Sequence, residues 1–176
     1  EFIRELKCEL DAQLGRFEGH FPEFHDHLRI DGHQHVQLIP AVFDALLSSV
    51  RRRGSTLEYL RVPTEPASPF LTTKVFFGIR PINWVKHWLL NFLWQLDRKK
   101  LPNYKLSSAI FCGVLFSGCM NTQRVLDVFP AYLTYAKQQD MNLEFLFHPG
   151  FVNSSEECLN PALSGFTAFY TSDGRR

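Results

Sequence analysis

The sequence predicts an α/β fold in which strands of a parallel sheet alternate with helices. Apolar residues make up 45% of the 176-residue chain and include 17 Phe, which is enough to build the core of a single domain spanning residues 1–176. Segments with helical spacing of apolar residues alternate along the chain with short apolar runs. Histidines follow or end two of these runs, and in parallel α/β folds the chemistry gathers at the carboxyl ends of strands.

Four segments show the three- and four-residue spacing of an amphipathic helix. The first ends at Gly19 and Pro22, the second starts at Pro40 and stops at Gly54, and the last has Asn121 as its N-cap. The predicted helices cover residues 1–17, 40–53, 82–96 and 121–136.

Four short runs rich in branched and aromatic residues predict the strands. They lie between the helices at residues 28–37, 57–62, 111–116 and 143–147. Alternation of this kind predicts parallel pairing with the helices outside, in either an open sheet or a barrel.

The run I-D-G-H-Q-H-V at residues 30–36 carries one carboxylate and two imidazoles at every second position. On a strand, Asp31, His33 and His35 would point to the same face, where they could bind a divalent metal. Asp31 could be a ligand or the acceptor that fixes an imidazole tautomer. The alternative is an ordinary polar strand end on the surface.

Two further residues are candidates because they stand at predicted strand ends. His148 precedes a Pro-Gly turn that would fix its ring, so it could serve as a general acid or base, or simply be a hydrogen-bonded turn residue. Arg61 could bind an anion or orient a carboxylate, or form a structural ion pair with Glu65.

Charge and cysteine usage limit the classes of partner and compartment. With 19 Lys and Arg against 18 Asp and Glu, no net field points to nucleic acid or to an acidic membrane. The four cysteines form no C-x-x-C pair, and residues 1–17 are too charged for a signal peptide, so we expect a cytoplasmic protein. The longest apolar stretch, residues 82–96, is too polar for a membrane span.

Several motifs together resemble the YdjC-like carbohydrate deacetylases, the family of chitooligosaccharide and hopanoid-biosynthesis deacetylases. The run I-D-G-H-Q-H at residues 30–35, followed by Pro40, is similar to that family's signature. R-V-P-T-E at 61–65, F-S-G at 116–118 and E-F-L-F-H-P-G at 144–150 resemble its later segments in the same order. The similarity covers about residues 5–151 and is weakest over 70–105.

The resemblance implies an irregular (β/α) barrel and a hydrolase that uses Mg²⁺ or Zn²⁺ to remove acetyl groups from N-acetylated oligosaccharides. It implies a metal ligand at His33, with His35 as the second choice, an acid/base or substrate-contacting imidazole at His148, and catalytic contributions from Asp31 and Arg61. A homodimer is compatible with it.

The family's N-terminal T-x-D-D-F-G strand and its G-x-H-x-x-L-T segment are missing from this sequence. We therefore expect the C-terminal portion of a deacetylase barrel, incomplete and truncated at both ends, with part of the metal site. A catalytically incomplete barrel that binds glycans or a partner chain is the alternative. A third interpretation, a cysteine hydrolase using Cys112 or Cys119 with His148, lacks a nucleophile signature.

Overall fold

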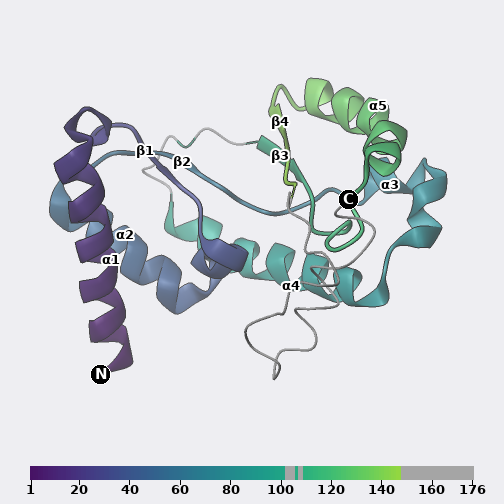
Figure 1. Cartoon of the computed structure of the whole chain (residues 1–176). Coiled ribbons are helices and arrows are strands. Elements are labelled where there is room, and N and C mark those ends of the chain that lie inside the picture. The colour runs from purple at the N-terminus through teal and green to yellow at the C-terminus, as the bar shows by residue number, and fades with distance from the viewer. Residues whose placement is uncertain (102–105, 107–108, 148–176) are drawn as a thin grey trace, which may run out of the picture. The chain divides into compact units, whose positions relative to one another are not determined.

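The computed structural model describes residues 1–101, 106 and 109–147. Within them the chain forms two compact units (Figure 1). The first unit comprises residues 1–64 and 88–109, and the second comprises residues 65–87 and those from 110 onward. His148 therefore lies outside the described residues.

The first unit pairs two helices with a small parallel sheet. Helix α1 (Phe2–His20) and helix α2 (Pro40–Arg53) match the predicted helices, and Gly54 ends α2 in the left-handed conformation that glycine adopts without steric cost. Strands β1 (Leu28–Ile30) and β2 (Leu57–Leu60) are parallel, as predicted. The core of this unit is formed by buried apolar side chains from these elements: Leu28, Phe43, Leu46, Leu47, Val50, Leu57, Leu60 and Leu101.

The second unit has its own core around a second two-stranded sheet. The sheet consists of strands β3 (Ala109–Cys112) and β4 (Asn142–Phe145). The unit also contains helices α3 (Ser68–Leu71) and α5 (Thr122–Gln138). Asn121 caps α5 as predicted, because its Oδ1 accepts the backbone N–H of Arg124 at 2.9 Å. The buried side chains that form this core are Phe70, Ile79, Ile110, Cys112, Leu115, Phe116, Val128, Tyr132 and Ala136.

Helix α4 (Pro81–Asp97) is the long helix predicted over 82–96. Short 3₁₀ turns complete the described chain at Pro22–Phe24 (η1), His33–Leu38 (η2), Lys74–Gly78 (η3) and Arg98–Lys100 (η4). The architecture is thus mixed α/β, with a parallel strand pair and a second two-stranded sheet.

The predicted strand over residues 28–37 is wrong in its second half. The strand ends at Ile30, and η2 begins at His33. Gln34 (φ 51°) and His35 (φ 63°) adopt left-handed backbone conformations, so the chain turns where the prediction extended it. Asp31, His33 and His35 consequently do not alternate along a strand.

Candidate functional site

The register of the β1–β2 pair brings the first candidate residues together. Ile30 lies opposite Leu60, and the Arg61 backbone N–H donates to the Ile30 carbonyl at 2.9 Å. The next side chains, Asp31 and Arg61, therefore emerge side by side at the carboxyl ends of two parallel strands. The Arg61 guanidinium forms an ion pair with the Asp31 carboxylate. The sequence placed Arg61 at a strand end, which is confirmed, whereas Asp31 was expected within a strand and instead directly follows its last residue.

A buried glutamine ties the histidine turn to the same strand end. Gln37 is 2% exposed, and its Nε2 donates to the Arg61 carbonyl at 2.9 Å. A Cβ on Gly32 would lie 2.2 Å from the Gln37 Oε1, so the side chain can pack here only over a glycine. Asp31, the turn and Arg61 thus belong to one connected structure.

The two histidines of the turn differ in setting. His33 is exposed and His35 is partly buried. His35 and its exposed neighbour Gln34 form a left-handed pair, which for residues with a Cβ costs about 1–2 kcal/mol each. Strain of this kind concentrates at functional sites, where the surrounding structure holds it in place.

Among the described residues, no three His, Cys, Asp or Glu side chains converge as a metal site would require. The turn supplies two imidazoles, which suit Zn²⁺ and similar cations, while Asp31 is engaged by Arg61. The described part of the chain therefore contains no complete set of side chains that could hold a metal.

The second unit contains a buried carboxylate that the sequence did not identify as a site residue. Glu65 is 2% exposed; its Oε2 accepts the backbone N–H of Leu115 at 2.6 Å and its Oε1 accepts that of Gly113. Burial raises the pKa of Glu65 to about 7, against the lowering effect of these backbone hydrogen bonds.

Asn83 holds the same loop from its carbonyl side. Its Nδ2 donates to the carbonyls of Leu115 at 2.9 Å and Ser117 at 3.0 Å, and its side chain is 1% exposed. His87, from the next turn of α4, lies with its Nε2 2.7 Å from the Glu65 carbonyl oxygen. The buried side chains of Glu65 and Asn83 therefore hold the backbone of residues 113–117. The sequence signals for Glu65 were its place in the R-V-P-T-E segment and its charge in the otherwise uncharged stretch of residues 62–73.

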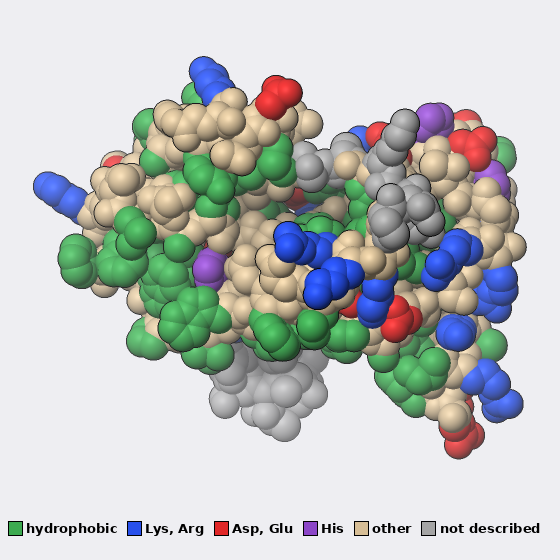
Figure 2. Space-filling model, turned by 180° about the vertical axis from the view of Figure 1, so that it is seen from behind, with side chains coloured by type: hydrophobic (Ala, Val, Ile, Leu, Met, Phe, Trp, Pro, Cys, Tyr) green, Lys and Arg blue, Asp and Glu red, His purple; other side chains and the backbone are tan. Residues whose placement is uncertain are grey.

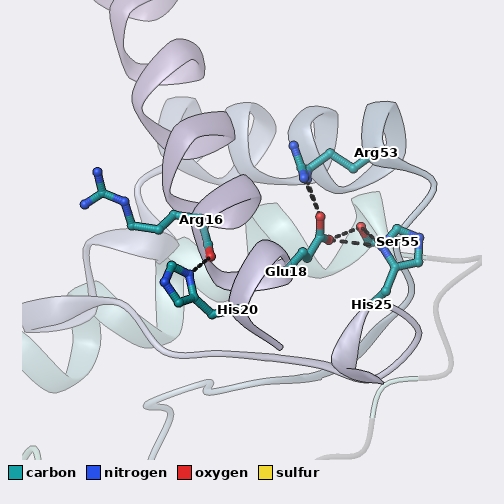
Figure 3. A network of polar contacts seen from close by, with 6 residues as sticks. All are labelled: Arg16, Glu18, His20, His25, Arg53 and Ser55. Atoms are coloured by element: carbon teal, nitrogen blue, oxygen red, sulfur yellow. Dashed lines mark hydrogen bonds and ion pairs between the residues drawn. The ribbon is translucent and has the colours of Figure 1, made fainter. Parts of the chain in front are cut away.

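Another polar cluster, in the first unit, resembles a catalytic triad in composition (Figure 3). Glu18 accepts from Ser55 Oγ at 2.5 Å and from Arg53 Nε at 2.6 Å, and His25 Nδ1 lies 3.3 Å from Glu18 and 3.4 Å from Ser55. In a triad the acid and the nucleophile contact opposite ring nitrogens, whereas here both contact the same one. The cluster instead ties α1 to the end of α2 and to the start of β2.

The cysteine-hydrolase interpretation finds no support in Cys112. Its side chain is fully buried, and burial, followed by the nearby Glu65 carboxylate, raises its thiol pKa well above the ordinary value. A nucleophilic cysteine needs the opposite shift. Cys8, Cys112 and Cys119 are free thiols.

Comparison with known proteins places the chain in a family. The model of the family described as "YdjC-like protein" matches residues 2–171. A carbohydrate deacetylase of Danio rerio is 27% identical over 182 aligned residues, which cover 88% of this chain and 52% of that protein. The chain thus spans about half the length of this curated relative. No solved structure matches. The chain belongs to the YdjC-like protein family.

Proposed function

We propose that this chain is part of a metal-dependent hydrolase that removes acetyl groups from N-acetylated oligosaccharides. The family and the name of the Danio rerio relative support a carbohydrate deacetylase. The observation that carries the proposal is the Asp31–Arg61 ion pair at the carboxyl ends of β1 and β2, next to the strained turn with His33 and His35. The family's irregular barrel, of which these strands would form part, belongs to the proposal.

In the proposed site His33, or His35 as the second choice, is a ligand of Mg²⁺ or Zn²⁺. The remaining ligands come from outside the described residues, because these contribute too few converging groups. A metal bound there would polarise the amide carbonyl and lower the pKa of a water molecule. His148 is the proposed acid or base that protonates the departing amine.

Arg61 has an orienting role in this scheme. Its side chain is 23% exposed and that of Asp31 is 45% exposed, so solvent and a ligand can reach the pair. A guanidinium fixes a carboxylate with directional hydrogen bonds. Arg61 would thereby hold Asp31 in position toward the turn that contains His33.

A catalytically incomplete protein that binds glycans or a partner chain is the second candidate function. It is favoured by the lack of three converging metal-binding side chains in the described part of the chain. None of the described helices is long and apolar enough to cross a membrane. The cytoplasmic location and the homodimer remain predictions.

Acetate release from a chitooligosaccharide, measured in the presence of Zn²⁺ or Mg²⁺, tests the proposed activity. Replacing Arg61 with Ala should reduce the rate by about a hundredfold, the usual scale for a displaced catalytic group. Arg29→Ala is the matched control, because Arg29 also lies on this strand pair and forms a surface ion pair with Glu58 at 3.5 Å. Equal rates for the two variants, or glycan binding without acetate release, would overturn the proposal, the latter in favour of the second candidate.

A further inference from the structure

The histidine turn is distinguished by its buried polar groups rather than by surface charge. Charged side chains of both signs are distributed over the face of the molecule that Figure 2 shows, so charge does not single out a site on that face. In the turn, by contrast, two features that lower stability lie within residues 34–37. The first is the left-handed pair of Gln34 and His35. The second is the buried Oε1 of Gln37, which finds no hydrogen-bond donor among the residues that the structure describes.

The Arg61 carbonyl fixes the orientation of the Gln37 amide. A carbonyl can only accept, so the amide nitrogen must face it, and Nε2 donates to it at 2.9 Å. The amide oxygen is then left over Gly32, in the space that a Cβ would occupy. An apolar side chain of the same length would fill this space without burying an unsatisfied oxygen. The contribution that the amide alone makes here is therefore its hydrogen bond to Arg61.

The hydrogen bond from Gln37 replaces one that a longer strand would make. The pairing of β1 with β2 ends at Ile30, whose carbonyl accepts the Arg61 backbone N–H at 2.9 Å. In a parallel ladder that continued, the backbone N–H of Gly32 would donate to the Arg61 carbonyl. Gln37 donates to that carbonyl instead, so the chain can leave the sheet after Ile30 without the loss of this hydrogen bond. The amide thus favours the turn over a continued strand.

We propose that Gln37 is a positioning residue, which selects the turn and so places His33 and His35 beside the ion pair of Asp31 with Arg61. The inference rests on the proposed function, because that function gives the selection of the turn a purpose. Backbone strain and unsatisfied buried groups lower stability, and they persist where a function needs the geometry that they accompany. Both occur here next to the residues proposed for the site.

Gln37→Met tests this proposal, because methionine has nearly the same length as glutamine and cannot donate a hydrogen bond. The matched control is Gln13→Met, since Gln13 is exposed on α1 and donates to the Glu9 carboxylate at 2.7 Å. Three quantities are measured on the full chain. They are the midpoint of denaturant unfolding, the affinity for Zn²⁺, and the hydrogen-exchange rate of the His35 backbone N–H, which donates to the Gly32 carbonyl at 3.0 Å.

The expected result separates positioning from stability. The unfolding midpoint of Gln37→Met should stay at the wild-type value, because the lost hydrogen bond is offset by removal of the unsatisfied oxygen. The His35 N–H should exchange at least about tenfold faster, because the turn opens more often when the amide no longer holds it. The affinity for Zn²⁺ should fall by about tenfold to a hundredfold, the usual effect of losing a group that orients metal ligands. Gln13→Met should match the wild type in all three.

An unchanged exchange rate at His35 in Gln37→Met would overturn the proposal, whether or not the chain binds Zn²⁺. A lower unfolding midpoint, with faster exchange throughout the first unit, would also overturn it and would make Gln37 a purely structural residue. Faster exchange at an unchanged affinity for Zn²⁺ would break the link between Gln37 and the site. A wild type that binds no Zn²⁺ would refute the proposed metal site, and faster exchange confined to the turn would then still support the selection of the turn by Gln37.

Discussion

Glu65→Gln is the substitution that most directly probes the hydrogen bonds between the buried Glu65 side chain and the loop after β3, which we call the Glu65 clamp. Glu65 accepts two backbone N–H groups with its two carboxylate oxygens, and its side chain has almost no access to water. Glutamine has nearly the same shape and carries no charge. Its Oε1 can accept one of the two backbone N–H groups, but its Nε2 cannot accept the other, so the variant carries no charge at any pH and also loses one hydrogen bond.

The magnitude follows from the pKa of Glu65, which burial raises from 4.5 to about 7. At about 1.4 kcal/mol per pKa unit, ionising this group in the folded protein costs about 3 kcal/mol relative to the unfolded chain. A raised folded-state pKa means that the stability contributed by the group is present below 4.5 and is lost as the pH rises to about 7. The neighbouring Cys112 and Tyr132 do not titrate in this range, because burial raises both of their pKa values.

Denaturant unfolding of the wild type and of Glu65→Gln, in the same buffers from about pH 4 to about pH 8, measures this cost. We expect the variant to be less stable than the wild type by about 1–3 kcal/mol at the acidic end, because one buried N–H lacks an acceptor, and to gain about 3 kcal/mol relative to the wild type by the alkaline end. The exposed Glu23→Gln serves as the control and should follow the wild type throughout. A difference in stability between the two proteins that does not change with pH would refute the reasoning, since Glu65 would then not titrate with a raised pKa.

Three further substitutions probe the first unit, each by its free energy of unfolding. Gly32→Ala should lower the free energy of unfolding by about 1 kcal/mol in the wild type, because the added Cβ displaces the Gln37 side chain from the Arg61 carbonyl. In a Gln37→Ala background the same substitution should cost almost nothing. Equal costs in both backgrounds would contradict this. Gln34→Gly should stabilise the protein by about 1 kcal/mol by relieving a left-handed backbone, and a loss of stability would rule out strain there. Glu18→Gln should cost about 2 kcal/mol at neutral pH. Burial acts to raise the pKa of Glu18, but the hydrogen bonds from Arg53 and Ser55 outweigh it and lower that pKa below 4.5. The cost of Glu18→Gln should therefore disappear as the pH falls through the lowered pKa. A cost that persists in acid would contradict this assignment.

The helices could be predicted because their signals are local. The spacing of apolar residues marks the helical segments themselves. Their boundaries are set by residues at or next to the ends: Pro40 at a helix start, Gly54 at a helix end and the Asn121 cap. The parallel pairing of β1 and β2 followed from the alternation of helices with strands, whereas the ion pair between Asp31 and Arg61 was not predicted.

The histidine turn could not be predicted from spacing alone. An alternating run of polar residues fits a strand equally well, and the turn is selected by the packing of Gln37 over Gly32, a contact that periodicity does not reveal. The Glu65 clamp joins groups 48 and 50 residues apart in the sequence.

The most direct test of the central claim, that the histidine turn contributes to a metal site, is the amount of Zn²⁺ bound per chain after equilibrium dialysis. We predict that His33→Ala, or His35→Ala if that residue is the ligand, loses most of the bound metal. His20→Ala should keep it, because His20 is exposed on α1 and its Nδ1 lies 2.8 Å from the Arg16 carbonyl oxygen of the same helix (Figure 3). Metal content that is unchanged in both His33→Ala and His35→Ala would contradict the account.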